Sequence, residues 1–423
     1  MPSRSCEALR LIAAGVLAIA GACSGGGGGS DAVKAVSGPC LNNASPCGLL
    51  DESYGVGGVV TFGVDEAMVA ASTDPSGNAY VTGSRGLVKV DASGNRVPGA
   101  FSMFAGTFAS VTPDAAGNLF VLVDRSLFKF DPAGNADADF GNSGRVDITL
   151  WLPEGNQQAI GPVMSMPDGS VIIGGTLHCP HLSCKMLLLA KLDSRGRWDT
   201  SFGPEGHRIT NIDMHPLAGS QLGVDPQGNL LVAGLLHDAA VTFPPFVAKL
   251  DRNGNLVDAF GEHGTWRAPV CGTNIFAPNV TGDAQGNVYV GQVCDSKATL
   301  TKLDAAGVAV ASFGNAGVAS DFFATSSASQ ILVVLGADGS IYVGGSMVEP
   351  ACSSVTIAKL DAGGRLVTGF GAGGRSNVGI SAARFTLLSL DSQGFLHLGG
   401  NRGDCTAQQG SIQPPYILMR MRG

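Results

Sequence analysis

The chain has few charged residues, few aromatic residues and no long apolar run. Of its 423 residues, 14% are charged, 6% are aromatic and 3 are tryptophan. Disordered chains are richer in charge and poorer in aliphatic residues, so this composition argues against disorder. No basic cluster is present that would neutralise a row of phosphates, and a nucleic-acid partner is therefore not expected. The apolar stretch from Leu11 to Ala20 is too short to span a bilayer.

Glycine, by contrast, is abundant, and two glycine-containing phrases recur along the chain. The 62 glycines, together with many Val, Leu and Ile residues, are typical of short strands joined by tight turns. One phrase, KLDxxGxxxxxFGxxG, begins at Lys191, Lys249, Lys302 and Lys359. The other joins a turn such as D-x-x-G-N to an apolar run, and it occurs at seven aspartates 40 to 58 residues apart: Asp74, Asp114, Asp168, Asp225, Asp283, Asp338 and Asp391.

Both phrases contain a turn whose chemistry is local. The Asp carboxylate caps the turn, and Gly supplies the positive φ that closes a hairpin. The flanking segments alternate or run apolar, as strands do, and two turns per unit predict four strands, A to D. Seven such units of roughly 55 residues predict an all-β fold, a seven-bladed β-propeller of four-stranded antiparallel blades. The Gly-Gly pairs that end several B strands predict close approach of neighbouring backbones.

The two ends of the repeat region predict how the ring closes. The last unit has strands A, B and C but no strand D before Gly423. The segment from Leu49 to Gly58, "LLDESYGVGG", has the pattern of a strand D without a unit of its own. We therefore expect this N-terminal outer strand to complete the last blade, which removes the free edges between the first and last blades.

These phrases resemble a known bacterial repeat. KLDxxGxxDxxFGxxG followed by DGxIxVGG resembles the delta-60 repeat, and the D-x-x-G-N-x-Y-V core is similar to the NHL repeat. The resemblance covers about residues 49–423, in seven units. It implies an exported propeller. The family has no established catalytic residues, so the resemblance assigns none to this chain.

Residues 1–22 have the pattern of an export signal, in which Arg4 and Arg10 precede or adjoin the apolar stretch. The following "AGAC" resembles the bacterial lipobox, which implies that Cys23 is lipidated and begins the mature chain. An A-x-A signal-peptidase site would cut at the same bond. Residues 23–48 then comprise a Gly/Ser tether and a small Cys-containing loop before the propeller at 49–423. Ser24 favours the outer membrane or cell surface, by analogy with enteric lipoproteins.

The cysteine content also indicates export. Cys6 leaves with the signal and Cys23 carries the lipid, so eight cysteines remain, and an even number in an exported chain indicates disulfides. Proximity in the sequence suggests the pairs Cys40/Cys47, Cys179/Cys184, Cys271/Cys294 and Cys352/Cys405. The true connectivity stays open at this point, because the sequence does not determine it.

The expected strand order assigns the connections to two faces. The A–B and C–D turns share one face and are tight, whereas the B–C and D–A connections share the other face, where long irregular segments occur. Binding residues are usually found on such loops. The candidates are Trp151, His178, His181, Phe243, Trp266, Phe322 and Phe323. Aromatic side chains there can stack on sugars or anchor a partner, although loop aromatics also cap propeller cores.

One loop, "HCPHLSC", combines two His and two Cys within seven residues. His and thiolate are suitable ligands for Zn²⁺ or copper. In an oxidising compartment, however, a Cys179–Cys184 disulfide beside two solvated histidines is the favoured interpretation. We therefore expect no metal site and no cofactor.

The expected A strands are small and apolar apart from the turn aspartates, so no ring of catalytic ligands is predicted in the central channel. The sequence favours an exported, membrane-anchored, monomeric binding or assembly scaffold. Its expected partner is an envelope protein or a glycan, and it contacts the membrane only through the lipid. Two alternatives remain: a periplasmic hydrolase or lyase with a metal at the channel mouth, and a purely structural surface protein.

Overall fold

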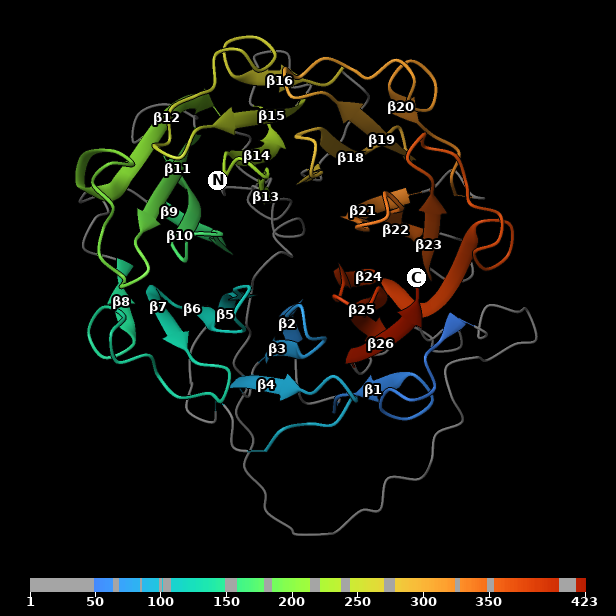
Figure 1. Cartoon of the computed structure of the whole chain (residues 1–423), viewed down its shortest axis with the longest axis horizontal. Coiled ribbons are helices and arrows are strands. Elements are labelled where there is room, and N and C mark those ends of the chain that lie inside the picture. Colours follow the sequence, from blue (N-terminus) through green and yellow to red (C-terminus); the bar gives the residue numbers. More distant parts are fainter. Residues whose placement is uncertain are drawn as a thin grey trace, which may run out of the picture. The chain divides into compact units, whose positions relative to one another are not determined.

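The computed structural model describes residues 49–63, 68–83, 86–98, 101, 108–148, 158–178, 185–213, 221–236, 244–269, 278–323, 328–347, 354–402 and 416–423. All of them belong to one compact unit, Pro39–Gly423. They form seven antiparallel blades set in a ring, with strands almost throughout (Figure 1). The predicted seven-bladed propeller is confirmed. Among these residues, no helix has the length and apolar character needed to cross a membrane.

The first three blades are described from the innermost strand outward. Blade 1 contains β2 (Met68–Thr73), β3 (Ala79–Gly83) and β4 (Gly86–Val90). Blade 2 contains β5 (Phe108–Pro113), β6 (Leu119–Val123), β7 (Ser126–Phe130) and β8 (Arg145–Asp147). Blade 3 contains β9 (Gln158–Ser165), β10 (Val171–His178), β11 (Lys185–Leu192) and β12 (His207–Asp213), with the short 3₁₀ turn η3 (Pro204–Gly206) before its last strand. Residues 99–107, where the outer strand of blade 1 is expected, lie outside the described residues except for Phe101.

The remaining blades follow the same order. Blade 4 contains β13 (Gln221–Val224), β14 (Leu230–Leu235), β15 (Pro245–Leu250) and β16 (Thr265–Arg267). Blade 5 contains β17 (Asn279–Gly282), β18 (Val288–Cys294), β19 (Lys297–Leu303) and β20 (Val318–Ala319). Blade 6 contains β21 (Ala328–Leu335), β22 (Ile341–Met347), β23 (Ser354–Leu360) and the first part of β24 (Arg375–Leu390). Blade 7 contains the rest of β24, then β25 (Phe395–Arg402), β26 (Tyr416–Arg422) and β1 (Val59–Thr61).

Strand β24 belongs to two blades. Its first residues pair with β23 as the outer strand of blade 6, and its last residues pair with β25 as the inner strand of blade 7. The chain therefore passes from the rim of one blade to the centre of the next without a separate connection. The outer strand of blade 6 and the inner strand of blade 7, which the sequence predicts as separate strands, are therefore one continuous strand.

The ring closes as predicted. Each inner strand contacts the next one around the ring, and the last of them, β24, contacts the first, β2. Strand β1 pairs with β26, placing Val59 opposite Met419 and Thr61 opposite Ile417. The strand itself follows the predicted segment: residues 49–58 form the phrase that leads into it, and Leu50 bridges to Met421. The N-terminal outer strand thus completes blade 7.

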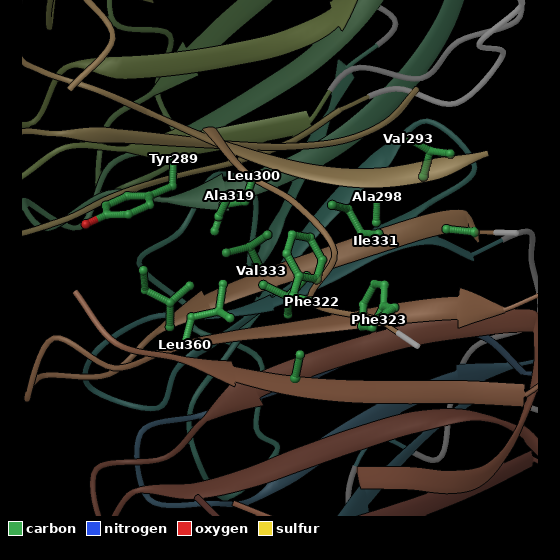
Figure 2. Packing of buried hydrophobic residues seen from close by; sticks show 14 of the residues in the cluster. Tyr289, Val293, Ala298, Leu300, Ala319, Phe322, Phe323, Ile331, Val333 and Leu360 are labelled. Atoms are coloured by element: carbon green, nitrogen blue, oxygen red, sulfur yellow. The ribbon is translucent and has the colours of Figure 1, made fainter. Parts of the chain in front are cut away.

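The core consists of apolar layers between neighbouring blades. Figure 2 shows one of these layers, between blades 5 and 6, where Phe322 and Phe323 lie close to Ile331 and Val333. The glycines of strand B make room for such rings: a Cβ on Gly344 would lie 2.7 Å from the ring of Phe385. The expected approach of neighbouring backbones is wrong at this glycine, because an aromatic side chain from the next blade occupies the space.

Candidate functional site

The antiparallel pairing sorts the connections onto two faces. The A–B and C–D connections of every blade emerge on one face, which we call the turn face, and the B–C and D–A connections emerge on the other, the loop face. Hydrogen bonds join turns of adjacent blades on the turn face, as from the backbone N–H of Ser392 to the carbonyl oxygen of Pro75 at 2.9 Å. The lysine Nζ of Lys89 likewise donates to the carbonyl oxygen of Pro132 at 2.7 Å.

The carboxylates of the turn face hold their own turns. Asp225 Oδ1 accepts hydrogen bonds from the backbone N–H groups of Gln227 at 3.0 Å and Asn229 at 2.8 Å, and Oδ2 accepts one from the Asn229 amide at 2.8 Å. Gly228 has φ 79°, as such a turn requires. The same bond to the backbone N–H four residues later is made by Asp74, Asp91, Asp114, Asp131, Asp193, Asp251, Asp283, Asp304, Asp361 and Asp391.

At two of these turns, the hydrogen bonds favour the ionised carboxylate. Burial by itself would raise the pKa of Asp225, but hydrogen bonds from Asn229 and Lys249 outweigh it and hold the pKa below the ordinary value. At Asp193, burial is outweighed in the same way by bonds from Arg197, and its pKa is also lowered. The turn aspartates are structural caps, each of which uses at least one carboxylate oxygen to hold its own turn.

Each blade also has one basic residue at the same place on strand C, and the sequence analysis did not single these residues out. They are Lys89, Lys129, Lys191, Lys249, Lys302, Lys359 and, in blade 7, Arg420. The residues opposite them on strand B are Tyr80, Phe120, Ile172, Leu231, Tyr289, Tyr342 and His397, in the same blade order. The signal was present in the repeated KLD phrase, whose lysine is this residue.

The carboxylate that pairs with this base comes from one of two positions, depending on the blade. In blades 2 and 3, it comes from the C–D phrase: Lys129 binds Asp137 at 2.8 Å and Lys191 binds Asp199 at 3.1 Å.

In blades 4 and 5, Val257 and Val310 occupy that position of the C–D phrase. Their backbone N–H groups donate to the carbonyl oxygen of the strand C base, as those of Asp137 and Asp199 do in blades 2 and 3. There the A–B turn supplies the carboxylate: Lys249 binds Asp225 at 2.9 Å, and Lys302 lies 3.8 Å from Asp283. In these four blades the turn face therefore balances its buried charges internally.

Blade 7 has the most polar version of this arrangement, which we call the seam cluster: Asp51, Tyr54, Asp391, His397 and Arg420. Arg420 Nε donates to Asp51 Oδ2 at 2.7 Å, and its guanidinium lies 4.9 Å from the centre of the Tyr54 ring. Tyr54 meets His397 edge to face at 5.9 Å, and His397 Nε2 lies 2.9 Å from Asp391 Oδ2. The cluster joins the N-terminal segment to the last strands of the chain.

Burial is the largest single influence on the pKa values of His397 and Asp51 in the seam cluster. It lowers the pKa of His397, with a smaller effect of the same sign from Arg420, and the contact with Asp391 only partly opposes this. At Asp51, burial would raise the pKa, but bonds from Ser53 and Arg420 outweigh it, so the pKa is lowered. At neutral pH, the cluster therefore contains a neutral imidazole and an ionised Asp51–Arg420 pair.

Polar side chains of the innermost strands join neighbouring blades. The hydroxyls of Thr73 and Ser389 share a hydrogen bond of 2.5 Å across the closing seam. Thr112 donates to the carbonyl oxygen of Val163 at 2.7 Å between blades 2 and 3. Within the described ranges, no group of three or more His, Cys, Asp or Glu residues is placed to hold a metal ion.

Two of the predicted binding residues belong instead to the core. Phe322 is 1% exposed and Phe323 is 8% exposed, and both pack in the layer between blades 5 and 6 (Figure 2). Their prediction as binding-face residues is wrong. The ring of Phe323 fills the space next to Gly345. The residues around Phe323 in the sequence do not indicate this space, because the glycine that provides it lies two strands later in the chain.

The other predicted residues are only partly within the described structure. Trp266 is half-buried on β16 and packs beside the apolar layer of blades 4 and 5. His178 ends β10, but its side chain is not described. Cys294 is disulfide-bonded, and its partner lies outside the described residues, because no other cysteine is among them. The pairing with Cys271 stays a prediction.

The remaining candidates also lie outside the described residues: Cys23, Cys40, Cys47, Trp151, Cys179, His181, Cys184, Phe243, Cys271, Cys352 and Cys405.

The strand bounds show which loop-face connections are long. The B–C connections of blades 1, 2 and 5 are two residues long, at 84–85, 124–125 and 295–296. Those of blades 3, 4, 6 and 7 are longer, at 179–184, 236–244, 348–353 and 403–415. The longer B–C connections therefore belong to two pairs of adjacent blades, and the D–A connections at 148–157 and 268–278 add further length to the same face.

No family model matches the chain, and no curated protein matches its sequence. Among solved structures, the chain is similar to a streptogramin B lyase, with a TM-score of 0.46 and 9% identity over 86% of this chain and 97% of that one. It is similar to virginiamycin B lyase from Staphylococcus aureus, with a TM-score of 0.47 and 7% identity over 85% and 98% of the two chains. Regucalcin, a calcium-binding protein from Agrobacterium tumefaciens, has a TM-score of 0.38 and 14% identity over 71% and 86%. With scores and identities this low, no conclusion about activity is drawn from these proteins.

Proposed function

We propose that the protein is an exported, membrane-anchored propeller of the delta-60 repeat type that acts as a binding or assembly scaffold through its loop face. The observation that supports this is the contrast between the two faces. The turn aspartates cap their own turns, and most of the strand C bases are paired with carboxylates. A face whose polar groups are already satisfied offers few groups to a partner.

The loop face has the features of a binding surface on a rigid scaffold. The connections between strands vary in length on the loop face much more than on the turn face. The long B–C connections belong to blades 3, 4, 6 and 7. Variable connections supported by regular strands are where binding residues are usually found. The proposed partner is an envelope protein or a glycan, bound over one or both of these blade pairs.

Export and anchoring are part of the same proposal. The signal at residues 1–22 would deliver the chain to the envelope, and lipidated Cys23 would hold it at the outer membrane or cell surface. The Gly/Ser tether in residues 23–48 would allow the propeller to reach a partner away from the lipid. The propeller is proposed to act as a monomer.

Loop replacement tests the binding face. The mature domain is used to capture envelope components, and residues 403–415 are replaced by the two-residue Asp-Ser connection that blade 5 uses at 295–296. Two further variants shorten 348–353 in blade 6 and 236–244 in blade 4 in the same way, so that both blade pairs are tested. Gln285→Ala on the turn face is the control. We expect capture to fall with at least one loop replacement and to persist with Gln285→Ala. Capture that every loop replacement leaves unchanged would contradict the proposal.

Metal analysis separates the scaffold from the hydrolase or lyase alternative. The purified domain is measured for bound metal, with His181→Ala as the variant that removes one candidate ligand. The scaffold predicts no stoichiometric metal. One equivalent of metal that is lost in His181→Ala would favour an enzyme with a metal at the channel mouth.

A further inference from the structure

The closing blade differs from the other six at one buried position. Opposite the strand C base, the other blades carry Tyr, Phe, Ile or Leu, none of which titrates in mild acid. Blade 7 carries His397 there, and its side chain is buried, with 1% of the residue exposed. Histidine is the side chain whose ordinary pKa lies between neutral and mildly acidic pH. Among the described strands, the exception falls in the one blade that combines strands from both ends of the propeller region.

His397 contacts the N-terminal segment directly. The edge-to-face contact with Tyr54 places the imidazole against a fully buried ring of that segment. Tyr54 in turn packs against the guanidinium of Arg420, which the ring of Phe395 covers at 4.6 Å. Arg420 holds Asp51 by a charged hydrogen bond, and the carbonyl of Arg420 accepts the backbone N–H of Asp51 at 2.9 Å. A change of charge on His397 therefore acts where the segment is attached.

Three charged groups face His397, and each comes from a different element. Asp391 lies in the turn between β24 and β25, Arg420 on β26, and Asp74 in the first turn of blade 1. The Asp74 carboxylate is engaged by its own turn and by the Tyr80 hydroxyl at 3.1 Å. Tyr54 faces the imidazole from the N-terminal segment and stays neutral, because burial raises the pKa of its hydroxyl. A proton on His397 would thus add a second cation beside Arg420 in a buried cluster.

We propose that blade 7 is an acid-sensitive latch, in which protonation of His397 weakens the attachment of the N-terminal segment 50–61 to β26 while the other blades stay closed. The closed latch holds the imidazole in the neutral form, and the open latch exposes it to water. The open form therefore binds the proton more tightly than the closed form. The latch is at full strength above the ordinary pKa of histidine, about 6.5, and weakens as the pH falls below it.

The other blades provide a matched substitution. At the position of His397, Tyr80 and Tyr289 donate hydrogen bonds to the turn aspartates Asp74 and Asp283 at 3.1 and 3.2 Å, as His397 contacts Asp391 at 2.9 Å. His397→Tyr therefore keeps the shape and the hydrogen bond of the site but removes the group that titrates. It is expected to fold and to close blade 7 independently of mild acid.

Hydrogen–deuterium exchange on the full mature chain tests the latch. Exchange, corrected for the intrinsic effect of pH, is followed in segments 50–61 and 416–423 between about pH 7.5 and about pH 5. In the wild type, we expect the open fraction at these segments to rise in acid, by up to about tenfold for each unit by which closure lowers the pKa. In His397→Tyr, protection of both segments should not change over this range.

A second substitution tests whether the response depends on the position of the histidine. Tyr289→His places the titrating group at the same position of blade 5, where the ring packs in the layer between blades 5 and 6, away from the N-terminal segment. It should leave the pH response of segment 50–61 as in the wild type. The latch would be refuted by protection of 50–61 that is independent of pH in the wild type. An equal acid response in His397→Tyr, or simultaneous loss of protection in all blades, would refute it as well.

Discussion

The buried ion pair of blade 4 gives a quantitative test of how the turn face is held together. Lys249 Nζ lies 2.9 Å from Asp225 Oδ2, and the two side chains are only 5% and 0% exposed. Lys249→Met keeps most of the apolar volume but removes the charge. Asp225 then keeps its bonds from Gln227 and Asn229 but loses its counter-ion in a site that water does not reach.

The expected cost follows from the geometry. Removing one partner of a buried ion pair typically costs about 3–5 kcal/mol, because the other charge stays buried and uncompensated. Asp225 keeps three hydrogen bonds from its own turn, so we expect the lower end, about 3 kcal/mol. The free energy of unfolding is measured by urea titration near neutral pH. The double variant Lys249→Met/Asp225→Asn should recover part of the loss, since no charge is then left buried.

The pH dependence of this cost has a definite sign. The pKa of Asp225 is lowered in the folded protein, so its contribution is present above the unfolded pKa of about 3.9 and is lost as the pH falls through the folded value. Without Lys249, the folded pKa of Asp225 rises, and the carboxyl can become neutral in mild acid. The difference between wild type and Lys249→Met should therefore narrow as the pH approaches about 4.

An exposed ion pair is the matched control for Lys249→Met. The Arg197–Asp193 pair has a similar distance, 2.7 Å, but its arginine side chain is 73% exposed. Arg197→Met should cost about 1 kcal/mol or less, because water screens the exposed charges. If Lys249→Met and Arg197→Met lower the free energy of unfolding equally, the argument that burial makes the turn-face pairs structural is refuted.

Three further changes test the core, the closure and the anchor. Phe323→Ala should lower the free energy of unfolding, measured in urea, by about 3–5 kcal/mol, because Phe323 is a core residue. Trp266→Ala should lower it by less, because Trp266 is only half-buried, and equal losses would contradict the core assignment. Deletion of 49–61 should cost about 5 kcal/mol or more, because buried side chains of blade 7 are lost, whereas deletion of 24–48 should leave the thermal midpoint near that of the intact chain. Cys23→Ser should move the protein from the membrane fraction to the soluble fraction on cell fractionation, and retention in the membrane would argue against the lipid anchor.

Several features of the fold were predictable because their causes are local. A turn such as the one at Asp225 is determined by residues within five positions, so each copy can be recognised without knowing its neighbours. Repetition then makes seven weak signals into one strong prediction of blade number. The closing strand could be predicted as well, because a unit without strand D and a strand D without a unit stand at opposite ends of the repeat region.

The chemistry of individual residues was less predictable. Phe322 and Phe323 follow a turn phrase in the sequence, as loop aromatics would, but both are core residues, and Phe323 packs in a space that Gly345 of the next blade provides. The KLD lysine is visible as a repeated letter, yet its partner is Asp137 in one blade and Asp225 in another. Choosing between such partners requires the positions of two segments that are not adjacent in the chain.

The sequence alone determined the repeat, the turns, the number of blades and the N-terminal segment that closes the ring, because these depend on φ preferences, side-chain caps and hydrophobic periodicity over a few residues. The closing strand itself, Val59–Thr61, lies just after the predicted segment. The tertiary structure alone decided which aromatics are core, which carboxylate meets each base, and that His397 lies buried between Tyr54 and Asp391. The physical reason is distance along the chain: Asp51 and Arg420 are 369 residues apart, and only the closed ring brings them together.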